Sequence, residues 1–132
     1  MQLKVLHNQV SELILKKSIA PKEGENLFDF KYRVCYDKNR GNVFGIIFNT
    51  TIDKPKDFTL EVEYITWFDS SENLTEEFKS SSFPIVNAPS IAFPFLRSFI
   101  STITLNAGYS PVLIPSINFQ SETTQERMLE PC

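Results

Sequence analysis

The sequence predicts an α+β fold in which a four-stranded antiparallel sheet lies beside one main amphipathic helix. Apolar and polar residues alternate in much of the first half of the chain, which is the period of strands with one buried face. After residue 90 the apolar spacing becomes that of a helix. Because strands come first and the helix follows, we expect the helix to pack on or beside an antiparallel sheet.

The clearest strand covers residues 28–36, where large apolar side chains occupy every second position. A turn at residues 37–42 leads to a second run at 44–52, and the two runs predict an antiparallel hairpin. A further turn at 53–57 precedes a third run at 58–68. These three strands form a meander, and a fourth strand is expected at residues 10–19, where the alternation is less regular.

The main helix is predicted to cover residues 93–107. Pro94 is acceptable in a first turn, Gly108 suits the position just past the end, and Pro111 prevents continuation. Residues 109–119 then read as an extended stretch that contains prolines. A chain of 132 residues without internal repeats fits a single domain over residues 1–132.

The composition excludes several classes of function. The net charge is -3, so the chain lacks the excess of basic residues that favours nucleic-acid binding. No apolar run approaches the roughly 20 residues of a membrane-spanning helix, and the N-terminus lacks a secretory signal, so we expect a cytoplasmic protein without membrane insertion. The two cysteines, Cys35 and Cys132, have no metal-ligand spacing and are expected to be reduced thiols.

No catalytic constellation is recognisable. The one histidine, His7, has no nucleophile or carboxylate motif around it, and the glycines do not form a phosphate-binding loop. Glu61 and Glu63 share one side of a strand as paired carboxylates do, but that side is charged overall and reads as a solvated sheet face. The sequence therefore predicts no enzyme, no cofactor and no metal, and favours a binding role.

Three motifs coincide in the last third of the chain: FPFLR at 93–97, GYSP at 108–111 and LIPSINF at 113–119. In this order and at this spacing they resemble the SecB chaperone family. The resemblance extends more weakly back to residues 58–68 and covers about two thirds of the chain. It implies a single SecB-like chaperone domain: a four-stranded antiparallel sheet with helices, assembled as a homotetramer that is a dimer of dimers. It also implies ATP-independent holding of unfolded preproteins and their delivery to the SecA motor of the Sec translocase.

The resemblance and the residue types together suggest site residues. An adaptable holdase needs apolar, aromatic-lined grooves. The predicted client-binding residues are Tyr109, Leu113, Ile114, Ile117, Phe119 and Trp67. The predicted oligomer interface is Leu96, Phe99, Ile100 and Ile103, and the predicted translocase-docking residue is Glu61. For both apolar sets, the alternative is packing in the core of the chain itself.

Two alternatives to a general export chaperone remain. One is a SecB-like chaperone dedicated to a single client, such as the antitoxin of a toxin–antitoxin system. The other, from a different class, is a small-ligand-binding or enzymatic α+β domain. The chain departs from the family after Phe119, where a longer second helix is usual and residues 120–127 are polar here. It also has Leu96 where the family commonly has a small residue.

Overall fold

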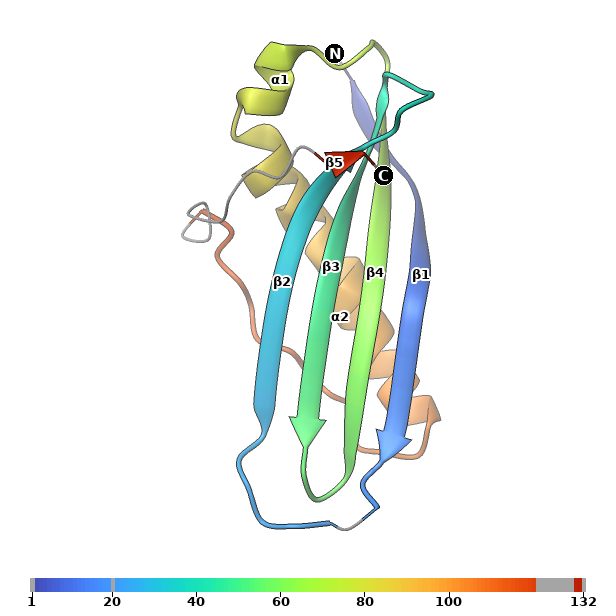
Figure 1. Cartoon of the computed structure of the whole chain (residues 1–132), viewed down its shortest axis with the longest axis vertical. Helices are drawn as coiled ribbons and strands as arrows, with labels where there is room; N and C mark the ends of the chain where they lie inside the picture. Colours follow the sequence, from blue (N-terminus) through green and yellow to red (C-terminus); the bar gives the residue numbers. More distant parts are fainter. Residues whose placement is uncertain (1, 20, 121–129, 132) are drawn as a thin grey trace.

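The computed structural model describes residues 2–19, 21–120 and 130–131 of the chain. Four long strands form an antiparallel sheet: β1 (Leu3–Lys17), β2 (Leu27–Tyr36), β3 (Val43–Lys54) and β4 (Phe58–Ser70). A two-residue strand, β5 (Glu130–Pro131), pairs in parallel with the end of β2 and completes the order β1-β4-β3-β2-β5 (Figure 1). The predicted α+β class with a four-stranded antiparallel sheet is confirmed.

The predicted hairpin between β2 and β3 is present. The two strands pair without a register shift from Leu27 opposite Asp53 to Tyr36 opposite Phe44. The Asp37 carboxylate closes the turn by accepting the backbone N–H groups of Asn39 at 2.8 Å and Arg40 at 3.2 Å. An aspartate at this position favours the turn because its side chain satisfies donors that the strands leave unpaired.

The first strand is longer than expected, since β1 begins at Leu3 and not at residue 10. Its pairing with β4 shifts between Val5 and His7 and again between Val10 and Glu12. Each bulge adds one residue to β1, so the residues that follow it alternate in the opposite phase, and apolar residues facing the core no longer fall at every second position. This explains why the alternation is irregular in the sequence.

The main helix, α2 (Ala88–Asn106), begins five residues earlier than predicted. It follows a short helix α1 (Glu76–Ser80) and a π-helical turn η1 (Phe83–Asn87). Pro94 therefore lies inside α2 and removes the hydrogen bond to the carbonyl of Ser90. Because Ser90 is exposed, water can satisfy that carbonyl, and the proline is tolerated. The predicted end is correct, with Gly108 at a φ of 99° just beyond it.

Helix α2 covers one face of the sheet, as Figure 1 shows, and the main core lies between them. Alternate residues of β2, β3 and β4 fill this core together with Ala92, Phe93, Leu96 and Ile100 of the helix. The helical stretch Phe83–Asn106 has the length and mean hydropathy, 1.2, of a membrane span by composition alone. The sequence did not predict this, because Pro, Ser, Thr and Arg interrupt the apolar residues.

The opposite face of the sheet carries a smaller apolar cluster of Cys35, Ile47 and Ile65, with Trp67 beside it. Cys35 is disulfide-bonded in the structure, so the expected reduced thiol is wrong for this residue. Cys132 and most of the tail after Gln120 lie outside the described residues.

Candidate functional site

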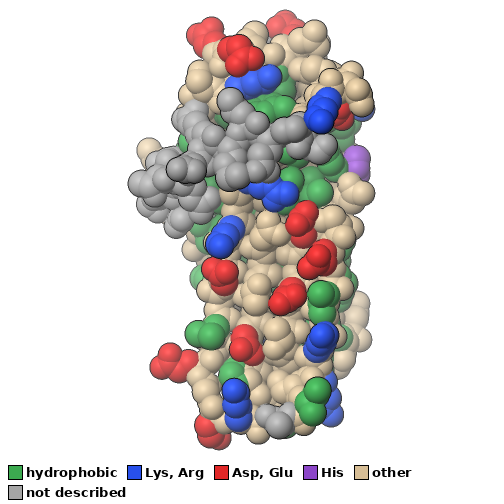
Figure 2. Space-filling model, in the orientation of Figure 1, with side chains coloured by type: hydrophobic (Ala, Val, Ile, Leu, Met, Phe, Trp, Pro, Cys, Tyr) green, Lys and Arg blue, Asp and Glu red, His purple; other side chains and the backbone are tan. Residues whose placement is uncertain are grey.

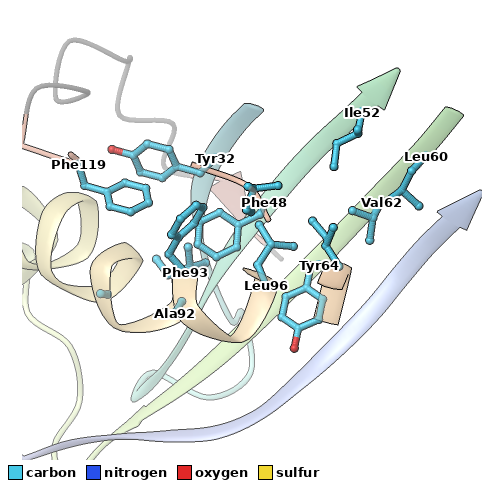
Figure 3. Close-up of a cluster of buried hydrophobic side chains, with 14 of the residues drawn as sticks. Tyr32, Phe48, Ile52, Leu60, Val62, Tyr64, Ala92, Phe93, Leu96 and Phe119 are labelled. Atoms are coloured by element: carbon cyan, nitrogen blue, oxygen red, sulfur yellow. The ribbon is translucent and has the colours of Figure 1, made fainter. Parts of the chain in front are cut away.

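Six aromatic side chains gather on the α2 side of the sheet near β2, and we call them the aromatic cluster. They are Phe28, Phe30, Tyr32, Phe48, Phe93 and Phe119. Phe30 is at the centre, with its ring centroid 5.6 Å from those of Phe48 and Phe93 and 6.1 Å from that of Phe119. Figure 3 shows Phe119 reaching toward Tyr32, Phe48 and Phe93 from outside the sheet.

The aromatic cluster is buried at one end and exposed at the other. Phe48 and Phe119 are almost fully buried, whereas Phe28 is 37% exposed. The rings of Phe28 and Phe30 stack with centroids 6.2 Å apart. The aromatic surface therefore continues from the core to the open end of β2.

The segment 109–119 is attached at its start to the end of α2. The fully buried Thr104 hydroxyl accepts the backbone N–H of Val112 at 3.0 Å and donates to the carbonyl of Ile100 at 2.8 Å. The Thr104 carbonyl accepts the N–H of Tyr109, whose ring packs on Phe58 with centroids 4.5 Å apart. At the other end, Phe119 is inserted into the aromatic cluster. Both ends of the segment are thus fixed.

Between these attachments the segment alternates like a strand. Val112 and Ile114 point into the core, and Ile114 is only 2% exposed, whereas Leu113 is 79% exposed. Among the predicted client-binding residues, Leu113 is thus the one fully at the surface, while Tyr109 and Ile117 are half-buried. Ile114 and Phe119 belong to the core, which was the alternative for them.

The sequence pattern did not identify Phe28 as a site residue. The alternation of β2 indicated only that Phe28 lies on the buried face. Its partial exposure arises because Phe28 lies near the start of β2.

Trp67 lies on the other face of the sheet, away from the segment 109–119. Its indole N–H donates to the Gln9 side chain at 3.0 Å, and its ring lies 6.4 Å from that of His7. Gly45 allows this placement, since a Cβ there would meet the Trp67 ring and the Cys35 sulfur at 3.1 Å. The structure therefore does not bring Trp67 together with the other predicted client-binding residues.

The predicted oligomer interface divides in two. Leu96 and Ile100 are fully buried against the sheet, so they offer no surface to a partner chain, while Phe99 and Ile103 are partly exposed. The exposed apolar side chains of α2 are instead Ile91, Phe95 and Leu105. Ile91 and Phe95 are four residues apart, and this spacing could have revealed them in the sequence once the helix was started at Ala88.

Glu61 is exposed on the sheet face opposite α2. Glu63 shares that face, and Glu12 of β1 lies directly opposite Glu63. Figure 2 shows this side of the molecule, with acidic side chains across the middle of the sheet. Like charges that face each other across two strands are unfavourable, so the arrangement is not explained by sheet stability.

Within residues 2–19, 21–120 and 130–131, no group of three or more His, Cys, Asp or Glu residues could hold a metal ion. A surface hollow of about 220 Å³ lies at the other end of the sheet from Phe28. Its lining residues are Gln2, Leu3, Lys4, Asp69, Ser70 and Ser71. It is separate from the aromatic cluster, and among the described residues it brings no catalytic arrangement together.

Fold and site together define an α+β sheet-and-helix protein whose aromatic core reaches the surface at an edge strand. The family model of SecB, described as the preprotein translocase subunit SecB, matches residues 6–128. The chain belongs to this family, and the resemblance read from its motifs is confirmed.

Individual relatives agree with this assignment. An uncharacterized protein of Methanocaldococcus jannaschii is 38% identical over 90 residues, or 64% of this chain and 57% of that protein. The protein-export protein SecB of Anaplasma phagocytophilum is 30% identical over 105 residues, or 78% of this chain and 61% of that protein. The chain thus spans about three fifths of the length of these relatives.

A solved structure has the same fold. It is the SecB-like chaperone of Mycobacterium tuberculosis in complex with a peptide from the HigA1 antitoxin. The match has a TM-score of 0.64 and 15% identity, and it covers 87% of this chain and 89% of that one.

Proposed function

We propose that this protein is an ATP-independent chaperone that holds unfolded polypeptides on the apolar surface around β2 and the segment 109–119. The observation that carries the proposal is the aromatic cluster, which is continuous from the core to the exposed ring of Phe28. A second exposed apolar side chain, Leu113, is held by a segment that is fixed at both ends. Family membership supports the same role.

This surface suits a binder of many sequences. Aromatic rings supply large contact areas with few rotatable bonds, and they do not require one particular partner side chain. Because the segment 109–119 is already ordered, binding an unfolded segment would not require this part of the protein to become ordered first.

The test is whether the purified protein suppresses aggregation of a chemically unfolded client without ATP, followed by light scattering. We expect Leu113→Ser to weaken suppression while leaving stability unchanged. Leu6→Ser, which alters an exposed leucine in a bulge of β1, is the matched control and should behave as wild type. Absence of suppression by wild-type protein at excess over client would refute the proposal.

For the wider role we propose protein export in the cytoplasm, with SecA docking on the acidic sheet face at Glu61. The exposed side chains of Glu61 and Glu12, with the half-buried Glu63 on the same face, support this. Glu61→Lys should weaken SecA binding in a pull-down without altering aggregation suppression. A variant that binds SecA as well as wild type would contradict the docking assignment.

We also propose a homotetramer, built as a dimer of dimers. Exposed apolar side chains on α2, namely Ile91 and Phe95, and on β1, namely Val10 and Leu13, support burial against further copies. Multi-angle light scattering would reject this if the protein were a monomer at micromolar concentration.

A dedicated client is the second candidate, favoured by the fold match to a chaperone that binds an antitoxin peptide. Client capture followed by mass spectrometry separates the two. Many preproteins indicate export, whereas one antitoxin indicates a dedicated partner.

A further inference from the structure

The two cysteines of the chain are far apart in the sequence, at positions 35 and 132. Cys35 lies in the second half of β2 and is disulfide-bonded. Because Cys132 is the only other cysteine in the sequence, it is the one available partner within the same chain. Cys132 directly follows β5, in which Glu130 pairs with Cys35 and Pro131 pairs with Tyr36. A covalent bond and a strand pairing therefore involve the same residue of β2.

Backbone pairing alone gives β5 little stability. The strand has two residues, and one of them, Pro131, has no N–H to donate. Typical strands are about five or six residues long. Pairing also confines the connection between the buried Phe119 and Glu130, and this costs conformational entropy. Two residues of pairing are too few to offset that cost, so the stability of β5 on β2 requires a further bond.

The surroundings of Cys35 determine how its disulfide can react. Cys35 is only 1% exposed and packs with Ile47 and Ile65 on the sheet face opposite α2. An external thiol therefore cannot reach its sulfur and must exchange at the other sulfur of the bond. A Cβ at Gly45 would lie 3.1 Å from both the Cys35 sulfur and the ring of Trp67, so these two groups flank the same glycine. The one tryptophan of the chain thus lies where it can report the state of Cys35.

From these observations we infer that Cys35 and Cys132 form a reversible disulfide that holds β5 on the edge of β2, and that thiol reductants release β5. To form the bond, the Cys132 thiolate attacks a small disulfide such as oxidised glutathione and displaces one glutathione thiolate. The Cys35 thiolate then attacks the Cys132 sulfur and displaces the second. The two cysteines lose two electrons and two protons in total, and the glutathione disulfide gains them. A dithiol reductant reverses both steps.

The disulfide acts as a redox switch on the fold, and this inference does not depend on the proposed holding function. In the cytoplasm, where we propose that the protein works, disulfides are rare and those that form are usually transient and redox-sensing. Oxidation closes a loop of about 100 residues, which stabilises the folded state by restricting the unfolded one. It also keeps the backbone of β2 paired with β5 at Cys35 and Tyr36. Reduction removes both effects together.

The first test maps the cysteines of the full chain. The protein is equilibrated with oxidised glutathione, its remaining thiols are blocked with N-ethylmaleimide, and the digest is analysed by mass spectrometry. We expect Cys35 and Cys132 in one cross-linked pair of peptides, a monomer on a non-reducing denaturing gel, and two free thiols after dithiothreitol. Two free thiols in oxidised glutathione, or a disulfide between two chains, would overturn the inference.

The second test compares oxidised and reduced wild-type protein, which needs no variant. Reduction should lower the melting temperature by about 5–20 °C, speed hydrogen exchange at the Glu130 amide, and change the fluorescence of Trp67. Without reductant, Cys132→Ser should match reduced wild type, and dithiothreitol should not alter it further. Circular dichroism verifies that the variant folds. If the disulfide forms but melting temperature and Glu130 exchange are the same in both redox states, the bond does not hold β5 and the inference is overturned.

Discussion

Phe119→Ala tests whether the segment 109–119 is part of the core. The Phe119 side chain is 3% exposed, and its ring centroid lies 5.1 Å from that of Tyr32 and 5.5 Å from that of Phe93. Truncation of a buried phenylalanine to alanine typically costs about 3–5 kcal/mol, by lost burial and by the cavity that remains. For a chain of this size, we expect a decrease in melting temperature of roughly 10–20 °C.

Leu113→Ala is the matched control for this variant, because it removes an apolar side chain of the same segment that is exposed to solvent. We expect its effect on the free energy of unfolding to stay within about 0.5 kcal/mol. Urea and thermal unfolding followed by circular dichroism measure both variants. A cost below about 1 kcal/mol for Phe119→Ala, or equal costs for the two variants, would refute the packing assigned to the segment.

Three further predictions concern single side chains. Thr104→Val leaves the buried N–H of Val112 without its acceptor and should destabilise the protein by about 1–3 kcal/mol in urea unfolding; Thr104→Ser should restore most of the loss. Gly45→Ala should cost about 1–3 kcal/mol and shift the fluorescence of Trp67, the one tryptophan, because the new Cβ would meet its ring at 3.1 Å; unchanged fluorescence would contradict the contact. Burial raises the pKa of Tyr64, so the folded state resists its ionisation and stability should fall as the pH rises above about 10; Tyr64→Phe should remove that part of the loss.

Much of the sheet could be predicted because strand alternation and turn residues are local signals. The run that became β2 and the turn at Asp37 indicated the hairpin correctly, since side-chain period and Asx turns depend on neighbours in sequence. The less regular β1 was predicted too short, because each of its two bulges reverses the alternation. The start of α2 was misplaced because a proline that fits a first turn can also lie inside a helix where the freed carbonyl is solvated.

The candidate site was only partly predictable. The apolar residues of the segment 109–119 were recognised, but Leu113 and Ile114 have similar side chains and opposite environments. Likewise, Leu96 and Phe95 are adjacent on α2, yet one is in the core and the other at the surface. Such differences depend on which side of α2 meets the sheet. The hydrophobic pattern does not specify this, because apolar residues such as Phe95 lie beside the residues that face the core.

The α+β class, the β2–β3–β4 meander and membership of the SecB family could be inferred from the sequence, because alternation, turns and short motifs are properties of contiguous residues. Three other features became known from the three-dimensional arrangement: Trp67 lies on the opposite face from the segment 109–119, Ile114 and Phe119 are core residues, and β2 is an open edge. These depend on strand order and on the extent of sheet that α2 covers. Both are set by contacts between residues far apart in the chain, which no local pattern records.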